Sequence, residues 1–579
     1  MKHRSLLRLL PYLARHRNRL LVGLGCLLAT TAFAVAAPWV LRYAIDDLTL
    51  ELTRGRLWAY AGTFVSVVLA EGVFRYYMRT LLIGVSRELE YELRRDLFQH
   101  LLRLSPGYYD RQRVGDIMSR GSSDLSAVRM VLGPGIMYTA NTVATFFGAI
   151  SLMLAISPRL TLLALVPLAT VSLLVRYFGR RIHDRFTAVQ EQLSEMTALV
   201  QESLSGVRVV RAYVQEPHEL KRFRAANDEY VERNERLVRL FGSLYPGIQL
   251  LIGSGAVLVL WLGGRMVISG SISLGEFVAF GAYLTMLHWP MIALGWVVNL
   301  FERGEASMSR ILEILDAEPE IADASPADVS QLAGAVRFRN LSFAYDGTPV
   351  LHGIDLDVKA GQTVAVVGPT GSGKSTLVRL LPRLYDAPPG SLFVDGHDVR
   401  TLPLETLRRA VGFIPQETFL FSVTVRENVA FGAADASDER VRWASGVAQL
   451  AQDVEDFPKG YETFVGERGI TLSGGQKQRT AIARALAMDP KILVLDDALA
   501  SVDTYTEEEI LKGLREVMAD RTTFIVSHRV STVKDADLIV VLREGRIVER
   551  GRHDQLVAAG GFYADLHRRQ LLEEEVQTA

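Results

Sequence analysis

The chain has 579 residues, which is too many for one ordinary hydrophobic core, so we expect several domains or a membrane part. Its mean hydropathy of +0.17 is high for a soluble enzyme. The 64 basic and 65 acidic residues nearly cancel. That balance gives no support to nucleic acid as a partner, because a phosphate-binding surface needs a clustered basic excess. The single cysteine, Cys26, excludes an intrachain disulfide.

Apolar residues concentrate in the first half, in runs that reach the length of about 20 residues needed to cross a bilayer. The first run follows basic residues, as in a secretory signal, but its apolar part is too long and five more runs follow. We therefore predict an all-α membrane domain with six transmembrane helices, over residues 20–43, 57–83, 130–156, 159–179, 245–268 and 276–301.

Basic residues indicate the orientation of these helices. The N-terminus and the long connections after the second and fourth spans are rich in arginine, whereas the other connections are short and hold few basic residues. By the positive-inside rule the N-terminus and both long connections lie in the cytoplasm. An even number of spans puts the second half there too, which predicts a multi-pass protein of the cytoplasmic (inner) membrane.

The two long connections are predicted to be helical. Residues 84–129 and 180–243 show apolar positions at helical spacing, interleaved with charges. We expect the membrane helices to continue into the cytoplasm, where a short crossing turn joins each pair. "SPGYYDRQRVGD" (105–116) has the Pro, Gly and Asp content of such a turn, and we expect a second near "EPHELKRF" (216–223).

The second half has the pattern of a different domain. A polar linker over 317–334 separates the membrane domain, 1–316, from a domain over 335–579. "VRFRNLSFAY" (336–345) alternates as a half-buried strand does, and "TVAVVG" (363–368) reads as a continuous buried strand. Strands and helices then alternate, so we predict a cytoplasmic α/β domain.

A nucleotide site is predicted directly after that buried strand. "GPTGSGKST" (368–376) fits the P-loop pattern G-x-x-x-x-G-K-[ST] between a strand and a helix. Backbone N–H groups of such a loop wrap phosphate oxygens. We expect Lys374 to contact the β- and γ-phosphates and the Ser375 hydroxyl to bind Mg²⁺. The predicted contacts are Gly368, Pro369, Thr370, Gly371, Ser372, Gly373, Lys374, Ser375 and Thr376.

The segment "LSGGQKQRTAIARAL" (472–486) narrows the class of nucleotide-binding protein. Small residues with a hydroxyl and free N–H groups precede a helix there, where an anion is favoured. The segment resembles the signature of an ATP-binding-cassette (ABC) domain. The resemblance implies nucleotide contacts from Leu472, Ser473, Gly474, Gly475 and Gln476.

Other short motifs agree with this resemblance in their order along the chain. "FAYDG" resembles the aromatic A-loop, which would put Tyr345 against adenine. "FIPQE" resembles the Q-loop, with Gln416 between Mg²⁺ and the membrane part, and "IVSHR" the switch histidine, His528. "ASVD" (500–503) resembles the D-loop. Each motif alone is weak, since each residue type is common in ordinary strands and loops.

The first half resembles the six-helix membrane domain of ABC exporters, and "YYDRQRVGDIMSR" (108–120) is similar to their first cytoplasmic loop. The resemblance thus covers the whole chain and implies one half-transporter that pairs with a second. Each ATP, with Mg²⁺, would lie between the P-loop of one cassette and the signature of the other. The implied activity is ATP-driven export of amphipathic drugs, lipids or peptides out of a lipid bilayer.

The strand "ILVLDD" (492–497) ends in two acids. Asp496 resembles the Mg²⁺-holding aspartate, whereas Asp497 stands where readily hydrolysing family members have the glutamate that orients water. Asp and Glu are similar in basicity, with side-chain pKa values of about 3.9 and 4.3. They differ in length, and misplacing a catalytic group by ~1 Å lowers the rate roughly 10²-fold. We expect slow hydrolysis at this P-loop.

A weakened acid beside an intact signature predicts one half of a heterodimer, whose partner carries the glutamate and uses the signature of this chain. The alternatives are a homodimer with slow ATPase activity, a non-pumping ATP-gated channel or regulator, and a P-loop enzyme merely anchored in the membrane.

Charges and aromatic residues within the spans are candidates for substrate contacts. Glu71 and Arg75 are four residues apart and predict either a structural ion pair or a site for cations. Trp289, Met291 and Trp296 either line the transport cavity or face lipid and neighbouring helices.

Overall fold

The computed structural model describes residues 4–50, 53–323, 327, 329–433, 435–502 and 504–578. They form two compact units. The first contains the chain up to Leu102 together with Val114–Ala317. The second contains Arg103–Arg113 and the chain from Glu318 onward. The chain therefore enters the second unit briefly at the turn around residue 108, before it returns to the first.

The described part of the first unit is built of helices. Six of them are long and apolar enough to cross a membrane, as predicted. Two π-helical segments, Arg120–Asp124 and Val131–Gly135, join α6, α7 and α8 into the third of these spans. The helices are α1 (Arg4–Leu7), α2 (Leu10–Arg15), α3 (Arg17–Leu50), α4 (Arg54–Leu101), α6 (Val114–Ser119), α7 (Leu125–Met130), α8 (Ile136–Ile156), α9 (Pro158–Ser205), α10 (Val207–Ala212), α11 (Glu216–Ile268) and α12 (Leu274–Leu315).

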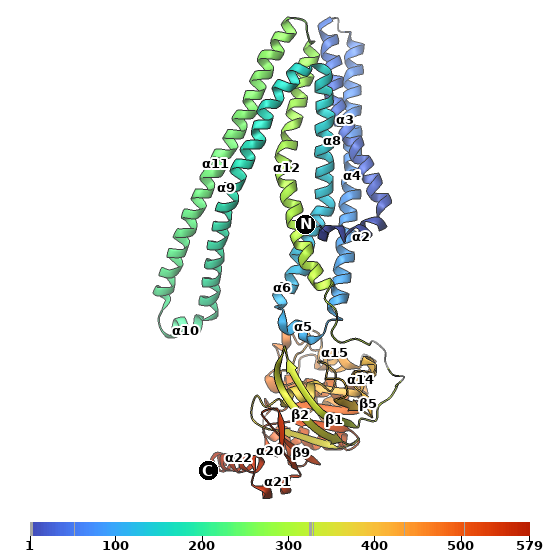
Figure 1. Ribbon diagram of the computed structural model, residues 1–579, viewed down its shortest axis with the longest axis vertical. Coiled ribbons are helices and arrows are strands. Elements are labelled where there is room, and N and C mark those ends of the chain that lie inside the picture. Colours follow the sequence, from blue (N-terminus) through green and yellow to red (C-terminus); the bar gives the residue numbers. More distant parts are fainter. Residues whose placement is uncertain are drawn as a thin grey trace. The chain divides into compact units, whose positions relative to one another are not determined.

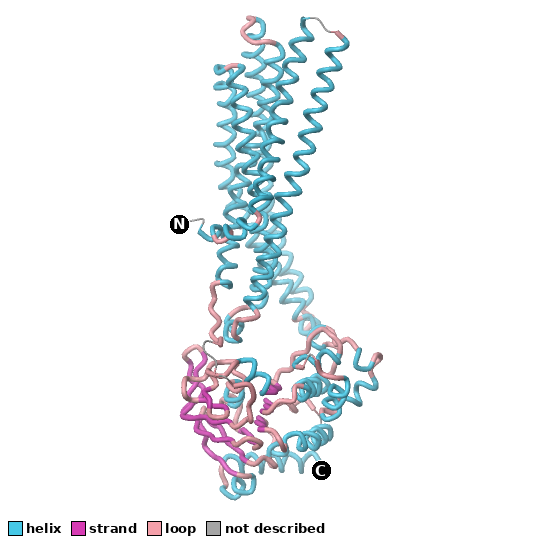
Figure 2. Tube along the Cα trace, turned by 90° about the vertical axis from the view of Figure 1, so that its right-hand side faces the viewer, coloured by secondary structure: helices cyan, strands magenta, loops and turns pink. Residues whose placement is uncertain are grey.

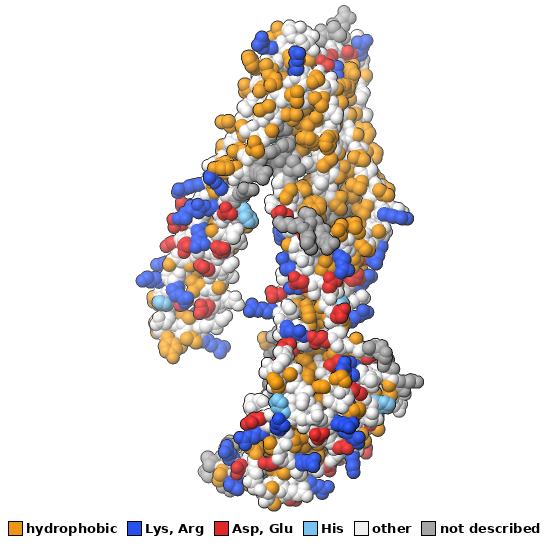
Figure 3. All heavy atoms as spheres, viewed as in Figure 1, with side chains coloured by type: hydrophobic (Ala, Val, Ile, Leu, Met, Phe, Trp, Pro, Cys, Tyr) orange, Lys and Arg blue, Asp and Glu red, His pale blue; other side chains and the backbone are white. Residues whose placement is uncertain are grey.

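Within this unit α3, α4, α8 and α12 pack as a bundle, and α9 and α11 form a long hairpin with α10 at its tip (Figure 1). The bundle core includes the fully buried Tyr283, whose hydroxyl donates to the carbonyl of Val35 at 2.8 Å. Apolar side chains cover the upper part of the helices, while charged side chains gather along their lower parts (Figure 3). This apolar band is the surface expected of a membrane-embedded region.

The second of the predicted turns between long helices lies before the predicted position. Residues 216–223 are helical, because α11 already begins at Glu216. The chain turns over Gly206–Gln215 instead, around the short helix α10. Pro217 misled the prediction: a proline in the first turn of a helix removes an N–H that has no intrahelical partner, so it starts a helix rather than breaking one.

The second unit combines two sheets with short helices (Figure 2). The strands are β1 (Val336–Tyr345), β2 (Thr348–Val358), β3 (Thr363–Val367), β4 (Leu392–Val394), β5 (His397–Asp398), β6 (Val411–Ile414), β7 (Ile492–Asp496), β8 (Thr522–Val526), β9 (Leu538–Arg543) and β10 (Arg546–Gly551). The helices are α5 (Pro106–Arg111), α13 (Lys374–Arg379), α14 (Leu404–Ala410), α15 (Val425–Val429), α16 (Asp438–Val447), α17 (Ala451–Asp456), α18 (Gly474–Ala487), α19 (Thr504–Met518), α20 (Val530–Val533), α21 (His553–Ala559) and α22 (Phe562–Thr578).

The larger sheet has the order β10-β9-β3-β8-β7-β6, and its five strands from β9 to β6 run parallel. The interior strands β7 and β8 are buried along their whole length, as their runs of apolar residues require in a sheet covered on both faces. The smaller sheet, β2-β1-β4-β5, is antiparallel. The predicted strands over 336–345 and 363–368 are β1 and β3.

Candidate functional site

The parallel strands bring the predicted P-loop, metal, water-orienting and switch residues to one edge of the larger sheet. The P-loop follows β3, Gln416 follows β6, Asp496 ends β7 and His528 follows β8. These four strands are consecutive in the sheet. The carboxyl ends of parallel strands meet at the same edge, where α/β proteins bind ligands. Residues up to 160 positions apart in the sequence thus share one site.

The P-loop over 368–376 needs its glycines. Gly368 and Gly373 have φ of +152° and +97°, in the region that favours glycine. A Cβ on Gly368 would lie 2.0 Å from the carbonyl oxygen of Leu542, so no other residue fits there. The Lys374 ammonium donates to the carbonyls of Gly368 and Pro369 at 2.9 and 2.8 Å. Burial lowers the pKa of Lys374, and an anionic ligand beside the ammonium would offset that desolvation.

Ser375 and Asp496 meet at the base of the P-loop. The Ser375 hydroxyl donates to Asp496 Oδ1 at 2.7 Å. Asp496 is fully buried, and burial raises the pKa of its carboxyl. Its other oxygen, Oδ2, is buried without a hydrogen-bond partner among the described residues. A buried carboxylate oxygen with no donor beside a hydroxyl fits a hard cation, and Mg²⁺ commonly takes one or two carboxylates plus phosphate oxygens and water.

Asp497 lies next to Gln416 and the switch segment. Its Oδ2 lies 3.5 Å from Gln416 Nε2, beyond the range of about 2.7–3.2 Å for ordinary N–H···O hydrogen bonds, so this contact is weak. Its backbone has φ of +50°, a left-handed conformation that Asp tolerates better than most residues. The pKa of His528 is lowered by partial burial and by the nearby charge of Lys374. The predicted metal, water-orienting and γ-phosphate residues thus lie together.

Tyr345 lines a cavity of about 570 Å³ within the second unit. Its ring meets those of Phe343 and Tyr385 edge-on, with centroids 4.9 and 5.0 Å apart. Tyr385 in turn donates its hydroxyl to Asp110 of α5 at 2.6 Å, and Arg111 of α5 pairs with Glu320. The predicted adenine-binding tyrosine therefore belongs to an aromatic cluster that contacts α5, the turn around residue 108.

The signature residues 472–476 form the start of α18. Ser473 Oγ accepts from the N–H of Gln476, whose side chain accepts from the N–H of Ser473, which makes a capping box. No hydrogen bond or ion pair between described residues joins 472–476 to the P-loop of the same chain. Ser501 of the predicted D-loop donates its N–H to Gln478 of α18, whereas Asp503 lies outside the described residues.

Two side chains that the motifs did not indicate hold the switch segment. Gln570 of α22 donates to the carbonyl of His528 at 2.6 Å and accepts from the N–H of Val530 at 2.7 Å. Glu507 of α19, almost fully buried, pairs with Arg529 and accepts from the Thr532 hydroxyl at 2.6 Å. The sequence shows only that Glu507 is an acid in the first turn of a helix, and its burial could not be recognised there. Nothing local distinguishes Gln570 from other glutamines.

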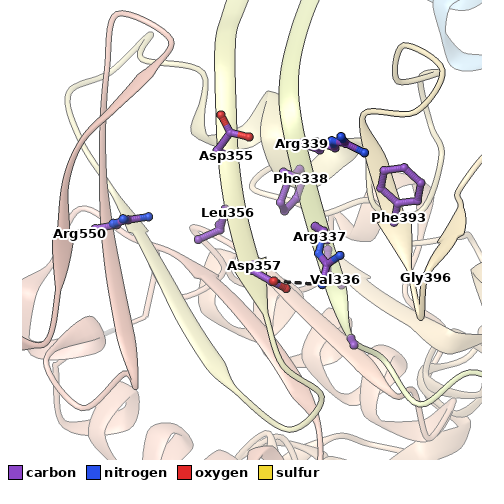
Figure 4. A pocket seen from close by; sticks show the side chains of 11 residues that line it. Val336, Arg337, Phe338, Arg339, Asp355, Leu356, Asp357, Phe393, Gly396 and Arg550 are labelled. Atoms are coloured by element: carbon purple, nitrogen blue, oxygen red, sulfur yellow. Dashed lines mark ion pairs between the residues drawn. The ribbon is translucent and has the colours of Figure 1, made fainter.

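A second hollow, of about 530 Å³, lies over the smaller sheet (Figure 4). Strands β1, β2, β4 and β10 line it, and Arg337 pairs there with Asp357 at 3.2 Å. None of the predicted nucleotide or metal residues lines this hollow. Its size alone therefore does not make it the functional site.

In the first unit Glu71 and Arg75 form the i,i+4 ion pair that was one of the two predictions for them. Trp289 lines a cavity there, and Trp296 packs edge-on against Tyr138 with ring centroids 5.2 Å apart. The side chain of Met291 lies outside the described residues.

Both halves of the chain match known family models. Residues 20–291 match the ABC transporter transmembrane region, and residues 351–500 match the ABC transporter model. The structure is similar to that of a bacterial Atm1-family ABC exporter with ATP bound, with a TM-score of 0.79 and 30% identity, covering 96% of this chain and 98% of the other.

Curated relatives match over nearly their whole length. The chain is 39% identical to YheI of Bacillus subtilis, a probable multidrug resistance ABC transporter ATP-binding/permease protein, covering 96% of this chain and 95% of the relative. It is 35% identical to the multidrug resistance-like ATP-binding protein MdlA of Escherichia coli, over 98% and 97%. It is 34% identical to an ATP-dependent lipid A-core flippase of Syntrophus aciditrophicus, over 98% and 95%. With six membrane helices and an ATP-binding cassette in one polypeptide, the chain belongs to the ABC exporters, a family of ATPase-coupled translocases.

Proposed function

We propose that this chain is one half of a heterodimeric exporter of amphipathic compounds, and that its own P-loop site binds ATP but hydrolyses it slowly. The observation that carries the proposal is the short acid Asp497, whose carboxylate makes only a weak contact of 3.5 Å with Gln416. The other nucleotide-binding groups that this chain would contribute to the site are present, from Lys374 to the buried Asp496. A nucleotide site whose acid is too short to orient water still binds ATP but hydrolyses it slowly, and we call it a holding site.

The residues around the P-loop divide the work as follows. Lys374 and the P-loop N–H groups bind the phosphates, and Tyr345 stacks on the adenine. Ser375, Asp496 and Gln416 hold Mg²⁺, which neutralises charge on the phosphate oxygens when bound. His528 contacts the γ-phosphate from β8, and Asp497 orients water weakly. The fit of Mg²⁺ rests on the unpartnered Asp496 Oδ2 beside the Ser375 hydroxyl.

The signature of this chain serves the partner. Ser473 and the N–H groups at the start of α18 present anion-binding groups, yet they make no hydrogen bond or ion pair with the P-loop of the same chain in the part that the structure describes. In the proposed dimer this helix end completes the partner's site, where the glutamate lies. The intact signature thus belongs to the active site at the partner's P-loop, and the short acid Asp497 belongs to the holding site at the P-loop of this chain.

The tip of the α9–α11 hairpin supports a second subunit. Leu204, Val209, Tyr213 and Val214 are exposed there, with Tyr213 and Val214 each 73% exposed. Val214 has φ of +54°, an unfavourable conformation for a β-branched residue. An exposed apolar patch of this kind is typical of a protein–protein contact. We infer that the partner's cassette receives it.

The membrane part sets orientation and substrate class. Arginine placement puts the N-terminus and the cassette in the cytoplasm and the spans in the cytoplasmic membrane. ATP favours the closed cassette dimer because both faces bind it there, and hydrolysis removes that preference. Relatives named for multidrug resistance and for flipping lipid A-core support amphipathic substrates.

The test is purification of the native complex with an affinity tag on this chain alone. We expect two different polypeptides in equal amounts, ATPase activity that transported compounds stimulate, and ATP-dependent uptake into inside-out vesicles. A single polypeptide with substantial ATPase activity would refute the heterodimer. ATP binding without any transport, in the presence of the partner, would favour the ATP-gated channel or regulator.

A further inference from the structure

The membrane bundle contains a cavity of about 390 Å³, with polar and apolar walls, between α3, α4, α8 and α12. This volume lies in the range of small-molecule binding sites, about 300–1,000 Å³. Three charged side chains line it, Glu71, Arg75 and Arg79, and all belong to α4. Thr30, Asn141 and other uncharged polar groups from α3 and α8 complete its polar wall, and Trp289 and Met286 of α12 form an apolar one.

The charges in this cavity do not cancel. Glu71 and Arg75 form an ion pair, which leaves the wall neutral at that level. Arg79, one turn further along the same helix, is exposed and makes no ion pair with any residue that the structure describes. Charged side chains within membrane spans are costly and mark substrate or ion pathways, or pair with one another. Arg79 thus carries the free-energy cost of a charge within a membrane span without an ion-pair partner to offset it.

We propose that this cavity binds the anionic headgroup of a transported amphiphile, with Arg79 as the residue that selects anions over cations. The carboxylate, sulfonate or phosphate of the ligand lies against Arg79, and its apolar body lies against Trp289 and Met286. Glu71 is occupied by Arg75 and therefore does not recruit a cation. The transport part of this inference rests on the proposed export function, whereas binding to the cavity does not.

The alternative for Arg79 is that its long side chain extends to the membrane surface and keeps its charge in water. That alternative predicts no effect of Arg79 on the charge preference of bound compounds. The two ideas therefore differ in a measurable selectivity. Arg87 offers a matched control: it lies two turns further on α4, carries the same charge and pairs with Glu90 at 3.2 Å outside the cavity.

The experiment uses the native complex in nanodiscs of phosphatidylcholine and two probes with the same apolar body. One is pyrenebutyrate, an anion, and the other is pyrenylbutyl-trimethylammonium, a cation. Fluorescence titration without ATP should show that the anion binds at least about tenfold more tightly, a difference of about 1.4 kcal/mol. Arg79→Gln should remove that preference by weakening the binding of the anionic probe alone. Glu71→Gln should tighten the binding of the anionic probe, and Arg87→Gln should leave the binding of both probes unchanged.

The inference would be overturned if Arg79→Gln weakened the binding of both probes equally, or if the wild type bound the cationic probe more tightly than the anionic one. Nanodiscs with added phosphatidylglycerol separate two sources of the ligand. Competition with pyrenebutyrate supports a lipid headgroup as the occupant, and absence of competition supports a dissolved amphiphile. Uptake of the probes into inside-out vesicles tests transport separately. Arg79-dependent binding without ATP-dependent uptake would refute the proposed export of such amphiphiles and leave the binding site in place.

Discussion

Substituting Asp497 with glutamate tests whether reach limits this nucleotide site. The added methylene extends the side chain by one bond of about 1.5 Å. In the structure Asp497 Oδ2 lies 3.5 Å from Gln416 Nε2, so the acid barely reaches the neighbouring group. If a misplacement of ~1 Å costs roughly 10²-fold, Asp497→Glu should raise hydrolysis at this P-loop up to about 100-fold. That corresponds to about 2.7 kcal/mol of activation free energy.

The backbone sets a separate cost for the same substitution. Asp497 has φ of +50°, where Glu is less tolerated than Asp, at a cost of about 1 kcal/mol. This strain is present in the ground state and the transition state alike, so it lowers stability and leaves the rate unaffected. We expect the Tm of the cassette to fall by about 2–4 °C while hydrolysis rises.

The assay must distinguish the two sites of the complex. Vanadate trapping of radiolabelled 8-azido-ATP, followed by photo-crosslinking and separation of the chains, reports which P-loop has hydrolysed nucleotide. The wild type should trap label on the partner, and Asp497→Glu should add label on this chain. Unchanged trapping on this chain, with 8-azido-ATP binding equal to the wild type, would show that reach is not the limitation.

Three further substitutions test the other parts of the site. Ser473→Ala removes a helix cap worth about 1 kcal/mol and the hydroxyl offered to the partner's nucleotide, so the ATPase activity of the complex should fall at least about tenfold while photolabelling of this chain stays constant. Constant activity would contradict the assignment of the signature. Tyr345→Ala should weaken binding of a fluorescent ATP analogue by about 1–3 kcal/mol through lost stacking, whereas Tyr345→Phe should bind normally, because the Tyr345 hydroxyl has no hydrogen-bond partner among the described residues. Equal effects of both would argue against stacking. Tyr385→Phe removes the bond to Asp110 of α5, about 1 kcal/mol, and should lower the amount transported per ATP hydrolysed with ATPase activity nearly unchanged. A parallel fall of transport and ATPase activity would mean that this bond only stabilises the cassette.

The sequence could predict which residues of the candidate site lie together where they follow one another in the chain, and their roles stay predictions. The P-loop carries its glycines, lysine and serine within nine residues. In the structure the Ser375 hydroxyl donates to Asp496, because β3 and β7 end at the same edge of the sheet. Buried strands were recognisable by their apolar runs, and β1 and β3 begin at the predicted residues. Six membrane helices followed from length and hydropathy in the same way.

Contacts between distant segments could not be predicted in this way. The pairing of Tyr385 with Asp110 joins residues 275 positions apart, and only the fold brings α5 to the aromatic cluster. Gln570 is an ordinary glutamine in sequence, yet its amide binds the backbone on both sides of the switch segment. The second turn was predicted at the wrong position for a different reason: Pro217 was interpreted as a turn residue. A proline in the first turn, with Glu216 and Glu219 beside it, instead favours the start of a helix.

In the proposed heterodimer the two nucleotide sites differ in timing rather than in occupancy. Lys374, Ser375 and Asp496 retain what is needed to bind ATP, so the nucleotide at this P-loop holds the two cassettes together through many turnovers. Hydrolysis at the partner's site, which Ser473 of this chain completes, then sets the rate at which the closed state of the cassette dimer loses part of its stabilisation. A ligand shifts a conformational equilibrium only by its differential affinity for the two states, and here hydrolysis removes only one of two such contributions. The cassettes therefore need not separate fully in each cycle, and Asp497→Glu should convert one lasting contact into a second transient one.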